Sequence, residues 1–148
     1  MSSILYLFFM IRPMNIITAI LCVLGVYFII DVRDLTLSIF PSIVLACYMA
    51  AGNILNDLID IEADRINKPY RPLVNYDINR YLVIIIILLL FMIGSWVSMY
   101  IDIYAMRIAV LFAMPGIISY EIIFKRIPLI GNLIISSLVG IVFIFAEL

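Results

Sequence analysis

Long apolar runs separated by short polar segments dominate the sequence. Five runs are free of charge over most of their length, and each is long enough to cross about 30 Å of hydrocarbon as a helix. They are 13–30, 35–56, 81–101, 103–124 and 127–146. Arg107 and Glu121 lie near the ends of the fourth run, where long side chains reach the membrane surface or face protein. The pattern predicts an all-α, polytopic transmembrane helix bundle of five spans, forming a single membrane domain over 1–148.

Basic residues are distributed unevenly between the two ends of these spans. In a five-helix alternation, one end carries Arg12, Arg65, Lys68, Arg71, Arg80, Lys125 and Arg126. The other end carries only Arg33 and Arg107. Short loops rich in Lys and Arg stay in the cytoplasm. The N-terminus and the polar loop 57–80 of this multi-pass membrane protein are therefore predicted to be cytoplasmic.

The composition excludes several classes of function. The chain is 67% hydrophobic and 13% charged, with a mean hydropathy of +1.27, which is typical of a membrane protein. Its 9 basic and 10 acidic residues nearly cancel, so no nucleic-acid partner is indicated. The absence of His excludes a Ser-His-Asp triad and His-ligated metals. Cys22 and Cys47 fall in apolar runs and are interpreted as core residues.

Polar side chains follow the second apolar run at helical spacing. Residues in a helix advance by about 100° each, so a continuing helix would place five of them on one face. They are Asn53, Asn56, Asp57, Asp60 and Asp64. Like charges on one face repel each other, and a cation would relieve the repulsion. Oxygen-only ligands suit Mg²⁺ or Ca²⁺, although a solvated helix end whose acids balance Arg65 and Lys68 is the alternative.

Basic residues follow the acidic stripe in a rigid segment. Pro69 and Pro72 bracket Arg71, and Lys68 comes directly before the first proline. Cations held beside carboxylates suit a polyanion whose charge is shared between metal and guanidinium. Arg12 and Lys125 lie at the same membrane face. For all of these residues, the alternative is that they serve only to orient the protein in the membrane.

These motifs together resemble the UbiA-type intramembrane prenyltransferases. The run Asn56-Asp57-x-x-Asp60-x-x-x-Asp64 followed by Asn67-Lys68-Pro69-x-Arg71-Pro72 is similar to the first aspartate-rich motif of that family. Arg12-Pro-x-Asn15 is similar to its first-helix signature, and Tyr120-x-x-x-x-Lys125-Arg126 with Gly131-Asn132 is similar to the junction of its fourth and fifth helices. Within the family, the Asn-Lys-Pro-x-Arg-Pro-Leu form is most similar to archaeal-type enzymes that prenylate a glycerol-phosphate ether lipid precursor.

The resemblance implies a site and a cofactor. It implies that Mg²⁺ and a prenyl diphosphate are held at the cytoplasmic end of a helix bundle, with the prenyl chain among the helices, and that the acceptor is a lipid or an aromatic compound. Asn56, Asp60 and Asp64 would hold the metal-diphosphate, with Asp57 supporting them as the fourth catalytic residue. Residues contacting the diphosphate would be Arg12, Arg71 and Lys125, with Asn53 and Lys68 beside them.

The sequence departs from the family's pattern in its length. Family members carry nine helices and a second aspartate-rich motif, whereas the predicted helices here match only the first five. We therefore expect a truncated, N-terminal half of the fold that needs a C-terminal half, supplied separately, or a homo-oligomer for Mg²⁺-dependent prenyl transfer.

Two other functions remain as alternatives. One is a non-catalytic remnant or cation-binding membrane subunit that uses the acidic stripe structurally. The other, a CDP-alcohol phosphotransferase, is disfavoured because the paired Asp-Gly and Ala-Arg elements of that family do not occur around Asp57 to Arg71.

Overall fold

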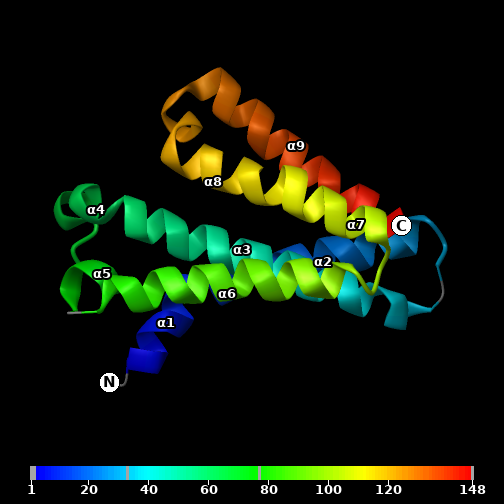
Figure 1. Ribbon diagram of the computed structural model, residues 1–148, viewed down its shortest axis with the longest axis horizontal. Helices are drawn as coiled ribbons and strands as arrows, with labels where there is room; N and C mark the ends of the chain where they lie inside the picture. The colour runs from blue at the N-terminus through cyan, green and yellow to red at the C-terminus, as the bar shows by residue number, and fades with distance from the viewer. Residues whose placement is uncertain (1–2, 33, 77, 148) are drawn as a thin grey trace.

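The computed structural model describes residues 3–147 apart from Arg33 and Asp77. Every regular element in this described part is helical, which confirms the predicted fold class. The elements are α1 (Ser3–Ile11), α2 (Pro13–Ile29), η1 (Leu35–Ser38), α3 (Ile39–Ile59), α4 (Ile61–Asn67), α5 (Pro72–Asn75), α6 (Arg80–Ser98), α7 (Ile103–Ile108), η2 (Ala109–Ala113), α8 (Met114–Ile122), η3 (Phe124–Arg126) and α9 (Pro128–Glu147). In Figure 1, α3 and α6 run side by side, and the segment α7–α8 lies beside α9.

Four helical segments are long and apolar enough to cross a membrane. They are Leu35–Ile59, Arg80–Ser98, Ile103–Ile122 and Pro128–Phe145. The α2 helix is also apolar but has 17 residues, which corresponds to roughly 26 Å of helix. Large apolar side chains such as Phe28, Leu88 and Leu133 are exposed on these helices. An apolar outer surface is what a bilayer requires, so the described helices have the surface of an integral membrane bundle.

The α3 helix is the centre of the bundle. It contacts α1, α2, α6, α8 and α9. Its Tyr48 is buried against Phe91 of α6, with ring centroids 5.2 Å apart in an edge-to-face arrangement, and its hydroxyl lies 2.8 Å from Ser95 Oγ. Without a hydrophobic driving force inside the bilayer, such close packing and interhelical hydrogen bonds hold membrane helices together.

Gly94 makes the close approach of α3 and α6 possible. A Cβ at this position would lie 2.7 Å from Tyr48 Cδ2 and 3.1 Å from Cys47 Cβ. Gly94→Ala is therefore expected to destabilise the protein by about 1–3 kcal/mol, because the two helices must move apart or Tyr48 must leave its rotamer. Unfolding in detergent, followed by Trp96 fluorescence, measures the change. Gly140→Ala is the matched control, since a Cβ there meets no atom within 4 Å; equal stability of the two variants would contradict this packing.

The fourth long segment contains a wide helical turn. Ala109–Ala113 forms a π-helical turn between α7 and α8, and Pro115 follows it at the start of α8. Proline lacks the N–H that an α-helix needs at this point, and a π turn is one way in which a helix absorbs such a defect. The segment stays continuous from Ile103 to Ile122 and brings its last residues to the same end of the bundle as the end of α3.

Candidate functional site

Charged and amide side chains from distant segments meet at the end of the bundle where α4 and α5 lie (Figure 1). We call them the charged cluster. Its members are Arg12, Asn53, Asn56, Asp57, Asp60, Asp64, Arg71, Glu121 and Lys125. Three cations thus meet four carboxylates and two amides.

Arg12 enters the cluster from the break between α1 and α2. Its backbone is left-handed, with φ 56° and ψ 68°, and Pro13 follows it at the first position of α2. A residue before proline is disfavoured in the right-handed helical conformation, so the chain turns here. The Arg12 guanidinium donates to Asp57 at 2.8 Å, to Asn56 Oδ1 at 3.1 Å and to Asn53 Oδ1 at 3.4 Å. The unusual backbone conformation is thus held by three contacts to α3.

Arg71 approaches the same carboxylate from the loop after α4. It is the extended residue before Pro72, which starts α5. Its Nη1 donates to Asp57 Oδ1 at 2.7 Å and to Asp64 Oδ2 at 2.6 Å. Asp57 and Asp64 are each only 5% exposed. Buried carboxylates need such partners, because an unpaired buried charge costs several kcal/mol.

Lys125 forms the other half of the cluster, from the short η3 turn. Its Nζ donates to Asp60 Oδ1 at 2.7 Å and to Glu121 Oε2 at 3.3 Å. Asn56 Nδ2 donates to both of these carboxylates, at 2.9 Å each. Gly131 keeps this turn close to α9, because a Cβ there would lie 2.8 Å from the carbonyl oxygen of Phe124. Lys125 is therefore positioned by packing of α9 against η3.

The acidic stripe is divided between two sets of cations rather than lying on one uninterrupted helix face. The α3 helix ends at Ile59, and Asp60 joins it to α4 with φ −88° and ψ 10°. Asp57 and Asp64 pair with the arginines, whereas Asp60 pairs with Lys125. Counter-charges that the helix itself lacks thus come from α1–α2, from the loop and from η3.

Two residues differ most from the sequence-based expectation. Lys68, expected beside the diphosphate site, is exposed at the end of α4 and makes no ion pair with the described residues. Glu121, which the sequence analysis did not assign to the site, is 9% exposed and bonded to Asn56 and Lys125. An acidic residue inside an apolar span is by itself a sign of function, and that signal could have identified Glu121.

The donor set suits a metal that shares its coordination with phosphate. Asp60 and Glu121 supply carboxylate oxygens close together, because both accept a hydrogen bond from Asn56 Nδ2, whereas Asn56 Oδ1 accepts from Arg12. Among the residues that the structure describes, no group of three or more acidic side chains is arranged to hold a metal ion. Mg²⁺ commonly binds through one or two carboxylates plus substrate phosphates. The residues present therefore fit Mg²⁺ brought with a phosphorylated ligand rather than a site made by protein alone.

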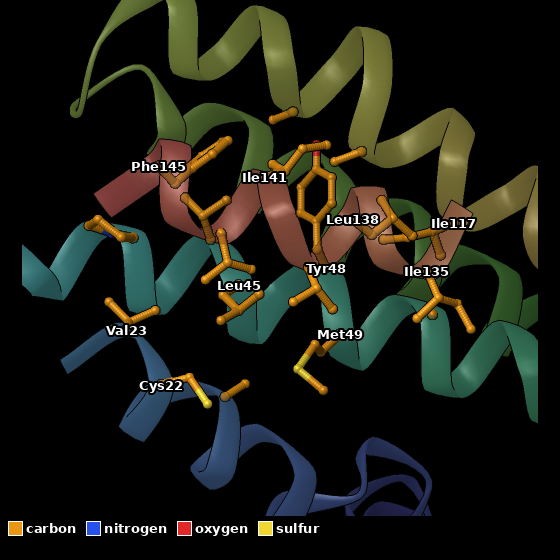
Figure 2. A pocket seen from close by; sticks show the side chains of 18 of the residues that line it. Cys22, Val23, Leu45, Tyr48, Met49, Ile117, Ile135, Leu138, Ile141 and Phe145 are labelled. Carbon is orange, nitrogen blue, oxygen red and sulfur yellow. The ribbon is translucent and has the colours of Figure 1, made fainter. Parts of the chain in front are cut away.

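An apolar cavity of about 520 Å³ begins at the charged cluster and extends between α2, α3, α8 and α9. Val23, Leu45, Leu138 and Phe145 are among the side chains that line it (Figure 2). Asn53 and Glu121 belong both to its lining and to the charged cluster. The cavity thus has one polar end and an apolar length.

A second, smaller cavity of about 370 Å³ lies beside the arginines. We call it the tyrosine pocket. Its lining comprises Tyr6, Phe9, Arg12, Asp57, Tyr70, Arg71, Pro72 and Tyr76. The rings of Tyr6 and Tyr76 stack with centroids 3.7 Å apart, which joins α1 to the segment after α5. The two cavities have no lining residue in common.

This combination defines a class of protein. An apolar cavity that ends in cations and carboxylates, within a helical membrane bundle, suits an amphiphile with an anionic head and an apolar tail. The sequence pattern of the UbiA prenyltransferase family matches residues 15–146. The chain therefore belongs to the UbiA prenyltransferase family, as the sequence motifs indicated.

Individual relatives give the extent of the similarity. The digeranylgeranylglyceryl phosphate synthase of Methanobrevibacter smithii is 32% identical over 140 residues, covering 92% of this chain and 49% of that enzyme. The enzyme of the same name from Methanococcus maripaludis is 39% identical over 107 residues, covering 72% and 38%. A solved structure concerning digeranylgeranylglyceryl phosphate synthase aligns with a TM-score of 0.88 and 36% identity, over 99% of this chain and 53% of that one. The chain spans about half the length of the curated relatives it matches.

Proposed function

We propose that this protein takes part in Mg²⁺-dependent transfer of a prenyl group from a prenyl diphosphate to a glyceryl phosphate lipid. The single observation that carries the proposal is the charged cluster at the end of the apolar cavity. Asn53 and Glu121 belong to both, so a diphosphate at the cluster would have its prenyl chain in the cavity. The names of the relatives support a glyceryl phosphate acceptor.

The proposed roles follow from the position of each side chain. Asn56, Asp60 and Asp64 would hold the metal-diphosphate, with Asp57 holding Arg12 and Arg71 in place. Mg²⁺, when bound, would neutralise negative charge on the departing diphosphate. The residues proposed to contact the diphosphate are Arg12, Arg71 and Lys125, with Asn53 beside them.

The protein's own side chains would contribute in two ways. Arg12 and Lys125 place positive charge where the diphosphate becomes more negative as its bond to the prenyl carbon breaks, which lowers the barrier. The apolar cavity positions the prenyl chain and keeps water away from the reactive allylic carbon. Both contributions use groups that the fold already holds in place.

We infer that transfer also requires helices equivalent to the other half of the relatives, in the same polypeptide or in a separate one. The charged cluster supplies one acidic motif together with Glu121, and the other acids after Asp77, Asp102 and Glu147, form no second motif in the sequence. A single acidic motif stabilises a leaving diphosphate less than two such motifs would. Each tenfold loss in rate corresponds to about 1.4 kcal/mol of activation barrier. Alternatively, a homo-oligomer would supply the second acidic site by using the first motif of another copy of the chain.

Binding of the donor tests the proposal. The protein in nanodiscs is expected to bind geranylgeranyl diphosphate at least about tenfold more tightly with Mg²⁺ than with EDTA, because the carboxylates repel the bare diphosphate. Calorimetry with each buffer measures the difference. Equal affinity in the two buffers would contradict the metal-dependent site.

The same measurement separates a cation-binding, non-catalytic subunit from the proposed enzyme. Such a subunit would bind Mg²⁺ without any diphosphate. Calorimetric binding of Mg²⁺ alone, unaffected by the diphosphate, would instead support the cation-binding subunit.

The orientation in the membrane is a further part of the proposal. We expect Asn75 in the cytoplasm and Asp34 outside, because seven basic residues lie at the cluster end and short basic loops stay in the cytoplasm. Both side chains are exposed. In a Cys22→Ala/Cys47→Ala background, Asp34→Cys is expected to react with an impermeant maleimide on intact cells, and Asn75→Cys only after permeabilisation. The reverse pattern would overturn the orientation.

A further inference from the structure

The tyrosine pocket combines two guanidinium groups with three tyrosine rings. Arg71 uses only Nη1 for its two carboxylate partners, and within the described part of the chain its Nε and Nη2 make no hydrogen bond. Arg12 likewise uses Nη1 and Nη2 but not Nε. Guanidinium groups with donors to spare in a pocket are suited to phosphate, which they bind through paired N–H groups.

The pocket also has features that favour an amphiphile over a free phosphate ion. Phe9 lines it, and Phe8 and Phe9 are 54% and 57% exposed on α1. Apolar aromatic side chains next to a cationic pocket allow a ligand's phosphate to meet the arginines while its chain lies along α1. A volume of about 370 Å³ is within the range of small-ligand sites.

We propose that the tyrosine pocket binds the phosphomonoester head of the prenyl acceptor, a glyceryl phosphate monoether, by contacts with Arg12, Arg71 and the tyrosines. This inference rests on the proposed function, in which the acceptor is a glyceryl phosphate lipid.

The position of the pocket agrees with that role. Arg12 lines the tyrosine pocket and Asn53 lines the apolar cavity, and the two side chains share a hydrogen bond of 3.4 Å. The acceptor's head would thus lie one side chain away from the end of the cavity proposed for the donor. The guanidinium groups of Arg12 and Arg71 would then lie between two anions, with the metal-bound diphosphate on their cluster side and the metal-free monoester on their pocket side.

Metal dependence separates the two ligands experimentally. With the protein in phosphatidylcholine nanodiscs, geranylgeranylglyceryl phosphate is expected to bind in EDTA, whereas geranylgeranyl diphosphate needs Mg²⁺. Tyr70→Ala/Tyr76→Ala should weaken the monoether at least tenfold and change donor affinity by less than threefold. The matched control, Tyr81→Ala/Tyr104→Ala, removes two exposed tyrosines outside the pocket and should change neither affinity.

Protection of an introduced thiol provides a test that does not depend on the tyrosine variants. In a Cys22→Ala/Cys47→Ala background, Phe9→Cys places a thiol in the lining of the pocket. The monoether should slow its reaction with maleimide at least fivefold, and the donor with Mg²⁺ should leave the rate unchanged. Absence of protection by the monoether would overturn the proposal.

The remaining outcomes also decide the proposal. Monoether affinity that is unchanged in the tyrosine variant, or lost together with donor affinity, would overturn it. Competition by phosphatidylglycerol as strong as by the monoether would overturn it too, since the pocket would then be a general site for anionic lipid heads. If the donor fails to bind the unmodified protein, the proposed function fails, but the monoether measurements still decide whether the pocket binds a phosphomonoester.

Discussion

Replacing Asp60 and Asp64 together by Asn is expected to abolish Mg²⁺-dependent binding of the prenyl diphosphate and to lower prenyl transfer by more than about 10³-fold. Loss of one well-placed electrostatic group commonly costs about 10²–10³ in rate, or roughly 3–4 kcal/mol of barrier. The two amides keep the shape of the carboxylates but remove their charge. Calorimetry in nanodiscs measures the binding, and transfer is measured with the helices equivalent to the relatives' other half present.

The fold should survive this double substitution. Arg71 keeps its contact with Asp57, and Lys125 keeps its contact with Glu121. In EDTA, the variant should bind the diphosphate at least as well as the unmodified protein, because it presents less negative charge to an anion. Glu62→Gln on α4, the short helix that carries Asp64, is the matched control, since the Glu62 side chain is 76% exposed and, among the described residues, pairs only with Arg65. If Mg²⁺ still raises the donor affinity of the double variant, Asp60 and Asp64 do not hold the metal-diphosphate.

The second large effect is expected for Lys125→Met. Lys125 is the cation shared by Asp60 and Glu121, and the three side chains are 15%, 26% and 11% exposed. Removing one partner of a largely buried ion pair typically destabilises a protein by about 3–5 kcal/mol, because the carboxylates left behind have no counter-charge. Unfolding in detergent measures the loss, and donor binding should fall in parallel. Arg126→Met is the matched control, since Arg126 is exposed and forms no ion pair among the described residues.

A double variant separates the structural role of Lys125 from its proposed role at the diphosphate. Glu121→Gln/Lys125→Met removes one of the two orphaned charges, and the amide oxygen at position 121 can still accept the hydrogen bond from Asn56. Stability should therefore recover in part, whereas donor affinity should stay low because the cation is still absent. Recovery of both properties together would show that Lys125 acts only through stability.

Residues that act locally were predictable from the sequence. The acidic motif and the Lys-Pro-x-Arg-Pro segment are contiguous, so their spacing alone placed Asp57, Asp60, Asp64 and Arg71 at one end of a helix. What spacing did not determine is that Asp60 faces Lys125 while Asp57 and Asp64 face the arginines. Those partners come from positions up to 65 residues away in the sequence.

Glu121 illustrates the same limit from the other direction. In the sequence it lies four residues before Lys125, where a simple helix pair explains it. In the structure it is hydrogen-bonded to Asn56, 65 residues away, and lines the apolar cavity. Its place in the charged cluster depends on α8 packing against α3, which no local pattern specifies.

The sequence by itself determined the helical membrane class, the family and the identity of the acidic motif, because run length, composition and contiguous motifs are properties of the chain alone. The tertiary structure alone decided which cation neutralises which carboxylate, where the apolar cavity ends, and that a separate pocket forms between α1 and the loop around Arg71. Each of these features requires side chains from helices distant in sequence to be brought within hydrogen-bonding or van der Waals distance, and helix packing in the bundle is what brings them there.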